Sequence, residues 1–253
     1  MDLGLSRKKA IILGGNRGIG RYTAELMRRE GPSVAICARG AEGVQEAGEA
    51  LQAMGEGTIF AQAADLESGE ETKAFVRAAI EALGGVDTLV HDASGFDQVG
   101  DEEGWERSFQ VDMMAGVLAV EEAIPALEES DAASITFVGS MASKYFFGRR
   151  SSYGPAKAAM RAYTNDLGQS LGKKGIRANA ISPGAVHFPG GSWDQRKIET
   201  PDFYARVERA IPLGRLGTGE EIARIIAFVS SPAGMWINSA HTVADGGQVA
   251  SVD

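Results

Sequence analysis

Short apolar segments alternate with longer amphipathic segments along almost the whole chain, and this alternation restricts the possible folds more than any other feature. Strands that alternate with helices favour parallel pairing through right-handed crossovers. Near-continuous apolar strands indicate that helices cover both faces of the sheet. We predict strands at 9–13, 33–38, 58–63, 86–91, 134–139, 177–182 and 241–245, and helices near 18–29, 41–54, 69–83, 102–128, 153–173 and 219–230. The sequence therefore predicts a single doubly wound α/β domain over residues 1–253, with a parallel sheet of about seven strands.

The segment at about 184–218 is the one long stretch in which we expect neither a strand nor a helix. It contains Gly, Pro, Trp and Phe. Because an irregular segment of this length inside a compact domain usually has a function, we expect it to cover the substrate as a lid.

Charge and composition limit the partners and the compartment. The chain has 34 acidic and 25 basic residues and a formal net charge of -9, which argues against nucleic acid or an anionic membrane surface as partner. It shows neither a signal-peptide pattern nor an apolar run long enough to span a membrane, so we expect a cytoplasmic protein. Cys37 is the only cysteine and lies in an apolar strand, where we expect an inert buried thiol. We assign no metal ligand.

The first predicted strand runs directly into "GGNRGIGR" (14–21) and then into a helix. Gly14, Gly18 and Gly20 permit positive φ and a close approach of backbone to a phosphate. The helix N-terminus adds free N–H groups and a positive dipole end that suit a pyrophosphate. An ordinary turn would use the same residues, but their place after the first strand of a doubly wound sheet favours dinucleotide binding.

The charges near the second predicted strand indicate which dinucleotide binds. An NAD site usually has an acid about 20 residues after the glycine loop, at the end of that strand. Here the strand ends in Ala38 and Arg39, and Arg17 lies inside the glycine loop. Two guanidinium groups favour a 2′-phosphate, so we predict NADP(H), although solvated surface arginines would give the same pattern. Asp65, after the third strand, is either a contact to the adenine edge or a simple turn residue.

The stretch "YGPAK" (153–157) places Tyr153 and Lys157 four residues apart, on one face of a helix. A free tyrosine has a pKa of about 10, which is too high for efficient proton transfer at neutral pH, and a nearby ammonium lowers that pKa. Ser140 follows the fifth strand, at the edge of the sheet where a hydroxyl can hydrogen-bond a substrate carbonyl. We therefore interpret the pair as a proton donor with its own tuning charge.

The ordered set "GGNRGIG", Ser140, "YGPAK", "SPG" (182–184) and "ADGG" (244–247) resembles the short-chain dehydrogenase/reductase family over nearly the whole chain. The resemblance implies that Tyr153 is the general acid in reduction and the base in oxidation. It also implies that Lys157 holds the nicotinamide ribose and that Ser140 polarises the carbonyl. Family members are usually tetramers, so we expect a homotetramer, with a dimer as the alternative.

The resemblance also implies a set of cofactor-binding residues at the ends of the strands. They are Gly14, Asn16, Arg17, Gly18, Ile19, Gly20, Arg39, Asp65, Leu66, Ala93, Ser94, Tyr153, Lys157, Pro183, Gly184 and Val186.

The sequence departs from the family pattern in four places. Leu13 and Phe188 stand where threonines are usual, and "HDAS" (91–94) replaces N-N-A-G. We expect His91 to be a strand-end residue that acts through its backbone. Asp112 stands where the family has a helix asparagine that is thought to hold a water in a proton relay.

An ionised Asp112 accepts hydrogen bonds and cannot donate them. We expect it to accept from water or from Lys157, to raise the pKa of that lysine, and so to preserve the relay as a catalytic residue. The alternative is an acid on the helix surface without a role.

Aromatic and apolar residues in 187–193, 202–207 and 145–150 favour an apolar or aromatic substrate. We therefore predict an NADP(H)-dependent reductase of such a ketone, or dehydrogenase of the alcohol. Arg149 or Arg150 would meet an anionic group, or would remain solvated. Two alternatives stay open: a 3-oxoacyl-[acyl-carrier-protein] reductase, which the acidic stretch 126–131 mildly disfavours, and a dinucleotide-binding sensor or scaffold without turnover.

Overall fold

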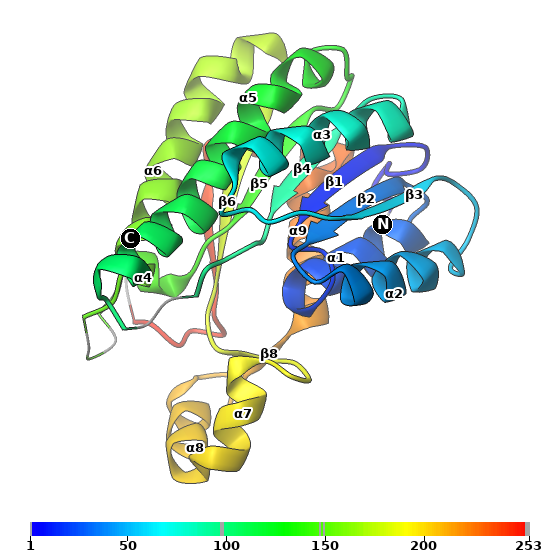
Figure 1. The fold of residues 1–253 in the computed structure, drawn as a ribbon. Helices are drawn as coiled ribbons and strands as arrows, with labels where there is room; N and C mark the ends of the chain where they lie inside the picture. Colours follow the sequence, from blue (N-terminus) through cyan, green and yellow to red (C-terminus); the bar gives the residue numbers. More distant parts are fainter. Residues whose placement is uncertain (1, 97–98, 147, 149, 251–253) are drawn as a thin grey trace.

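The computed structural model describes residues 2–96, 99–146, 148 and 150–250. Within them, a parallel seven-stranded sheet with the order β3-β2-β1-β4-β5-β6-β9 forms the centre of the protein (Figure 1). Its strands are β1 (Lys9–Leu13), β2 (Ser33–Ala38), β3 (Ile59–Ala63), β4 (Thr88–His91), β5 (Ser134–Val138), β6 (Arg177–Pro183) and β9 (His241–Ala244). The predicted doubly wound α/β fold is confirmed.

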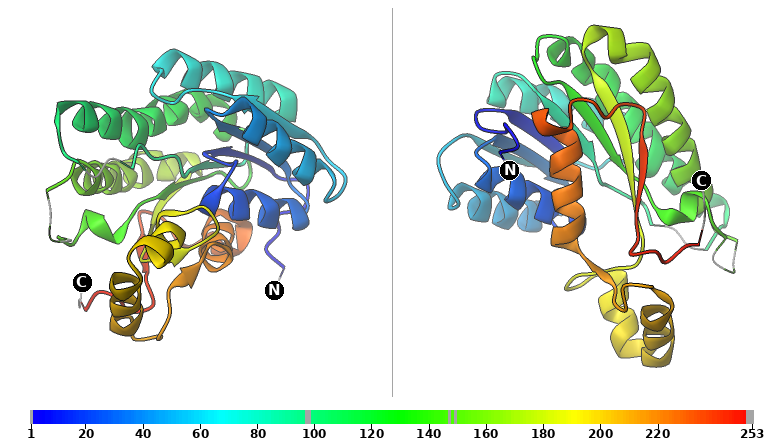
Figure 2. Two further views of the ribbon diagram at one scale, coloured as in Figure 1. Left: turned by 60° about the horizontal axis from the view of Figure 1, so that its bottom comes forward. Right: turned by 180° about the vertical axis from the view of Figure 1, so that it is seen from behind.

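Helices cover both faces of this sheet, as the apolar strands predict. One layer is formed by α1 (Gly18–Arg29), α2 (Ala41–Gln52) and α9 (Gly219–Ser230). The other layer is formed by α3 (Gly69–Leu83), α5 (Ala115–Leu127) and α6 (Tyr153–Leu171). Figure 2 shows the first layer from behind, with α9 running across that face of the sheet. Each layer has its own buried apolar cluster against the strands.

The predicted helix 102–128 is continuous but not uniform. It begins as α4 (Glu102–Ser108), passes through a π-helical segment at Phe109–Met114 and continues as α5. A π-helical turn holds one more residue than an α-turn, so it changes the direction in which the following side chains point. The predicted strand 86–91 begins at Thr88 in the structure, and the Asp87 carboxylate just before it accepts from the Lys9 N–H of β1.

The expectation that 184–218 is irregular is wrong. The segment contains α7 (Ser192–Glu199) and α8 (Pro201–Ala210), and the short parallel strands β7 (Val186–His187) and β8 (Gly217–Thr218) join it to the main body. Figure 1 shows α7 and α8 standing apart from the sheet and its covering helices. Tyr204 and Ile211 form a small apolar cluster of their own there, with Trp193 packed against it. Within the described residues, none of the helices has the length and apolar character that crossing a membrane requires.

Candidate active site

A cavity of about 1700 Å³ lies at the carboxyl ends of the strands. The strand order reverses between β1 and β4, and doubly wound sheets bind ligands in the crevice at such a point. Segments that follow β1 to β6 line one side of the cavity, and Trp193 and Phe203 of the α7–α8 segment line the other. Nearly all of the predicted site residues line it. The exceptions are Gly20 and Asp112, which lie behind the lining residues.

The glycine loop packs so tightly that its glycines cannot be replaced without movement. Gly14 has φ +90°, and a Cβ added there would lie 2.8 Å from the Ala93 nitrogen. A Cβ on Gly20 would lie 2.3 Å from the Gly14 carbonyl oxygen. Arg17 precedes α1 in extended conformation and makes no side-chain cap, so the helix N-terminus faces the cavity without one. This cradle of close backbone and open N–H groups fits the pyrophosphate of a dinucleotide.

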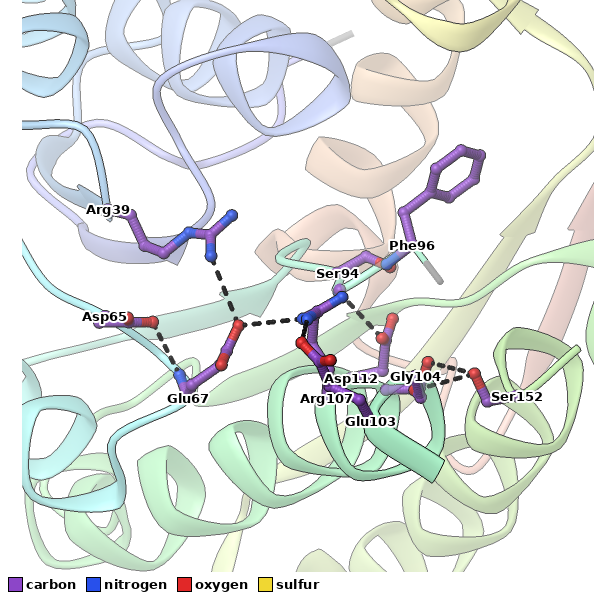
Figure 3. Close-up of polar contacts among 12 residues, drawn as sticks. Arg39, Asp65, Glu67, Ser94, Phe96, Glu103, Gly104, Arg107, Asp112 and Ser152 are labelled. Atoms are coloured by element: carbon purple, nitrogen blue, oxygen red, sulfur yellow. Dashed lines mark hydrogen bonds and ion pairs between the residues drawn. The ribbon is translucent and has the colours of Figure 1, made fainter. Parts of the chain in front are cut away.

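Arginine and glutamate side chains meet at the end of the cavity beside β2 and β3. Figure 3 shows Arg39 and Arg107 reaching Glu67 from opposite sides. The Glu67 Oε1 atom lies 3.4 Å from Nη1 of Arg39 and 3.5 Å from Nε of Arg107. Asp65 accepts a hydrogen bond from the Glu67 N–H at 3.0 Å, which is how a turn residue behaves. Sequence reasoning missed Glu67, although it directly follows Leu66, which was among the predicted cofactor-binding residues.

Tyr153 and Lys157 line the cavity, and Asp112 lies behind them beside the Lys157 amine. Tyr153 is the first residue of α6, and the Lys157 Nζ lies 5.8 Å from the centre of its ring. This Nζ donates to the Val138 carbonyl at 2.9 Å and lies 3.0 Å from Asp112 Oδ1. The structure thus places Asp112 beside Lys157, as the sequence predicts, while its catalytic role stays a prediction.

The alternative of a surface acid at Asp112 is wrong. Its side chain is fully buried, and its Oδ2 accepts from the Gly95 N–H at 3.0 Å. The π-helical segment carries Asp112 and turns it toward α6. Such segments recur at functional sites because the extra residue re-aims one side chain.

Burial and the neighbouring charges shift the pKa values of Tyr153 and Lys157 in opposite directions. Burial raises the pKa of Tyr153, while the Lys157 ammonium and a hydrogen bond with Ser140 lower it, and the balance leaves it above its ordinary value. Burial would lower the pKa of Lys157, but Asp112 and Tyr153 raise it, so the amine stays charged. Lys157 is therefore a permanent cation beneath the phenol.

Sequence reasoning did not single out Asp92, the second residue of "HDAS". Its Oδ2 accepts from the Gly20 N–H at 2.7 Å, and its side chain lines the cavity. Burial raises its pKa to about 7, against the opposing effects of Lys157 and the Gly20 N–H. The exchange of an asparagine for an acid in a family motif is the signal that would have found it.

His91 is a strand-end residue, as predicted, and its ring is buried. Its Nε2 lies 3.1 Å from the Val111 carbonyl oxygen, and its ring meets Phe137 edge-on. Burial lowers the pKa of His91 to about 4, so the imidazole is neutral at physiological pH. These contacts connect β4 to the π-helical segment and keep the ring away from the cavity.

Aromatic rings line the part of the cavity next to Tyr153. Phe96 meets the Tyr153 ring edge-on at 5.3 Å between centroids. The Phe188 ring lies against the glycine loop, 3.0 Å from where a Cβ on Gly18 would stand. Arg150 also lines the cavity, and Arg149 lies outside the described residues.

The end of β6 and the residues after it also line the cavity. Pro183, Gly184 and Val186 line the cavity there. A Cβ on Gly184 would lie 2.6 Å from that of Asp245, so glycine is required for the close approach of the two segments. The Ala185 N–H donates to the Gln248 side chain at 2.8 Å, which fixes the chain between β6 and β7.

Comparisons with known proteins agree with this geometry. A family model described as enoyl-(acyl carrier protein) reductase matches residues 14–248. Isoepoxydon dehydrogenase patN of Penicillium expansum is 34% identical over 254 residues, which cover 98% of this chain and 96% of that protein. The probable 2,4-dienoyl-CoA reductase of Bacillus subtilis (strain 168) is 30% identical over 252 residues, which cover 96% of this chain and 97% of that protein.

Among solved structures, the L-sorbose reductase of Gluconobacter frateurii, complexed with NADPH and L-sorbose, superposes with a TM-score of 0.91. The two chains are 25% identical, and the match covers 100% of each. Fold and relatives together define an oxidoreductase with a Rossmann-like sheet. The chain belongs to the short-chain dehydrogenase/reductase family, as its motifs indicate, and this family uses a nicotinamide cofactor.

Proposed function

We propose that the protein is an NADP(H)-dependent oxidoreductase that interconverts an apolar or aromatic ketone and its secondary alcohol. The observation that carries the proposal is the cluster of Ser140, Tyr153 and Lys157 at the cavity, with the amine 5.8 Å from the phenol ring. Proton transfer to a carbonyl needs a donor whose conjugate base is stabilised, and a buried ammonium provides that.

Each side chain has a separate task in this proposal. In reduction, Tyr153 gives its proton to the substrate oxygen, and Ser140 donates a hydrogen bond to the same atom. Lys157 stabilises the phenolate that forms, and Asp112 keeps Lys157 charged and in place. The nicotinamide cofactor supplies the hydride when it is bound. In oxidation the same groups work in reverse, with Tyr153 as the base.

The dinucleotide is proposed to lie across the carboxyl ends of the strands, in contact with the residues that the family resemblance implies. The glycine loop and the N-terminus of α1 receive the pyrophosphate, and Pro183, Gly184 and Val186 border the nicotinamide. Arg17 and Arg39 are proposed to bind a 2′-phosphate, which makes NADP(H) the preferred cofactor. The similar L-sorbose reductase of G. frateurii is complexed with NADPH, and this supports the preference.

Glu67 weakens the argument for a 2′-phosphate at Arg39. Its carboxylate lies 3.4 Å from the Arg39 guanidinium, so a 2′-phosphate would compete with Glu67 for that arginine. Asp65 is proposed to reach the adenine edge with the carboxylate oxygen that does not hold the turn.

The substrate is proposed to pack among Phe96, Trp193 and Phe203, which line the cavity around Tyr153, with α7 and α8 as its lid. A second candidate is a reductase of acyl groups on a carrier protein, because the matching family model carries that description. Arg150 borders the same space and would suit a substrate with an anionic group.

The test is oxidation of NADPH and NADH over a panel of ketones, diketones and β-ketoacyl thioesters. Tyr153→Phe should abolish turnover and leave cofactor binding intact. Tyr145→Phe is the matched control, because Tyr145 lines the same cavity outside the cluster. Turnover that survives in Tyr153→Phe would refute the assigned chemistry. Cofactor binding without turnover on any substrate would favour a sensor or scaffold.

We also propose that the chain assembles as a homotetramer. Trp236 is fully exposed, and Met235 beside it is 57% exposed. Large apolar side chains exposed together are typical of a surface that a partner covers. Light scattering should give four times the monomer mass, and Trp236→Glu should lower it. A monomeric wild-type protein would contradict the proposal.

A further inference from the structure

Asp92 joins two elements that the cofactor must touch. It follows β4 directly, and its Oδ2 accepts from the Gly20 N–H in the first turn of α1 at 2.7 Å. A Cβ on Gly20 would stand 2.8 Å from this oxygen, so the carboxyl packs directly on the helix backbone. Arg17 provides no side-chain cap, and the carboxyl of Asp92 satisfies one of the open N–H groups of α1 from a distant part of the sequence.

The groups that face Asp92 leave its charge poorly compensated. From α6 it feels the Lys157 ammonium, which lowers its pKa. The same ammonium already lies 3.0 Å from Asp112 of the π-helical segment. Tyr153 on α6 is a neutral phenol, and its pKa is raised by Asp92.

Two further groups near Asp92 are uncharged. His91 on β4 is neutral, because burial lowers its pKa to about 4. Cys37 lies on β2, and its backbone carbonyl accepts from the Gly14 N–H. Its thiol is neutral, because burial raises its pKa to about 12. Burial therefore dominates at Asp92 and raises its pKa to about 7, so the carboxyl is part protonated near neutral pH.

A dinucleotide brings further negative charge to the same place. Its pyrophosphate is proposed to lie at the N-terminus of α1, and the Asp92 carboxyl contacts the first turn of the same helix. Two anions at one helix end repel each other, and protonation of Asp92 removes that repulsion. An asparagine, the usual residue of the family pattern, would carry no such charge.

We propose that Asp92 is a positioning residue that fastens α1 to β4 and becomes more fully protonated, with uptake of protons from solvent, as the dinucleotide binds. The proposal rests on the cofactor binding in the proposed function and not on turnover. No bond other than the O–H bond forms, and the Gly20 N–H still donates to the other oxygen of the protonated carboxyl. Cofactor affinity must then fall as the pH rises, because deprotonated Asp92 has to capture a proton before the anion is accepted.

Calorimetric titration with NADH and NADPH counts the protons directly. Titrations at pH 7.5 in two buffers of different ionisation enthalpy should show uptake of about half a proton by the wild-type protein. Asp92→Asn keeps an oxygen for the Gly20 N–H and should show none with NADH. NADH is the decisive ligand. The 2′-phosphate of NADPH has a pKa of about 6 and would add its own protons to the count. Glu129→Gln removes an exposed carboxylate outside the cavity and should leave the proton count unchanged.

The dissociation constant provides a second measurement. That of NADH should rise about 3- to 10-fold for the wild-type protein between pH 6.5 and 8.5, and should stay flat for Asp92→Asn. Equal proton counts and equal pH dependence in both proteins would overturn the proposal. If Asp92→Asn does not fold, as judged by circular dichroism, the wild-type count with NADH decides, and a value of zero overturns it.

The outcomes separate this proposal from the proposed function. Proton-coupled binding without turnover would refute the proposed activity and support the role of Asp92. Turnover with equal proton counts would refute only the role of Asp92. A wild-type protein that binds neither cofactor would overturn both.

Discussion

Replacement of Asp112 by asparagine tests how buried charges set the acidity of the tyrosine. Asp112→Asn keeps an oxygen for the Gly95 N–H and removes the charge that faces Lys157 at 3.0 Å. At the 5.8 Å between the Lys157 amine and the Tyr153 ring, an ammonium and a phenolate attract by about 3 kcal/mol at an effective dielectric constant of about 20. Since Asp112 Oδ1 lies 3.0 Å from the same amine, it is at most about 9 Å from the ring centre. At that distance its charge opposes the attraction by about 2 kcal/mol.

The sign of the effect follows from these charges. Burial first, and the negative charge of Asp112 after it, raise the pKa of Tyr153, so loss of the Asp112 charge lowers that pKa. A change of about 2 kcal/mol is more than tenfold in an equilibrium, and solvent screening reduces it to roughly tenfold. Tyr153 also raises the pKa of Lys157, so we expect this amine to stay charged in Asp112→Asn. The rise of alcohol oxidation with pH, which follows ionisation of Tyr153, should then occur at lower pH in the variant.

The assay is kcat/KM for alcohol oxidation between pH 6 and 10 in wild type and variant. On the acidic side of the profile, the variant should be up to about tenfold faster. It should also unfold more easily, since removal of one partner of a buried ion pair costs about 3–5 kcal/mol. Glu103→Gln on α4 is the matched control, because Glu103 is an exposed acid of the same continuous helix. A folded Asp112→Asn protein with an unchanged pH profile would refute the reasoning.

Three further substitutions or reactions test other parts of the site. Gly20→Ala should abolish measurable dinucleotide binding and lower the melting temperature, because its Cβ would lie 2.3 Å from the Gly14 carbonyl oxygen; wild-type affinity would contradict the tight cradle. Arg39→Ala should weaken NADPH binding about 10-fold or more and leave NADH almost unaffected, and an equal loss for both would argue against a 2′-phosphate contact. Cys37 should not react with a disulfide reagent at pH 8 until the protein is denatured, because burial raises its pKa to about 12; rapid reaction in the folded state would show that the thiol is accessible.

The fold could be predicted because its signals are local and repeated. The predicted helices 18–29, 69–83 and 219–230 agree with the structure to the residue. Two of them begin directly after a side-chain cap, since Ser68 accepts from the Glu71 N–H, and Thr218 and Glu221 form a capping box. The apolar strands identified the buried sheet for the same reason, because a strand covered on both faces has few places for polar residues.

The two helices in 184–218 were missed because the glycines and prolines of this segment suggested an irregular loop. The spacing of Tyr204, Val207 and Ile211 is helical, and Pro201 occupies the first turn of α8, so the signal was present but short. The orientation of Asp112 is a different case. An extra residue in a helical turn leaves no mark in a hydrophobic pattern, so the expectation that Asp112 meets Lys157 came from the family resemblance and not from helical spacing.

The role of Asp92 depends on the sheet order. Its carboxyl reaches Gly20 because β4 lies directly beside β1, although 72 positions separate the two residues in the chain. No pattern along the chain reports that proximity. Glu67 is similar, because its contact with Arg107 joins the end of β3 to α4 across the cavity.

The small apolar cluster beneath α7 and α8 allows this part of the enzyme to diverge by itself. Tyr204, Ile211 and Leu216 pack with one another and belong to neither cluster that holds the helices on the sheet. Mutations on these two helices can therefore accumulate without loosening the sheet or the cofactor cradle. A lineage can exchange one substrate for another by drift or recombination within a segment of some tens of residues. Independent change of this segment would produce relatives with different activities, such as an isoepoxydon dehydrogenase and a sorbose reductase.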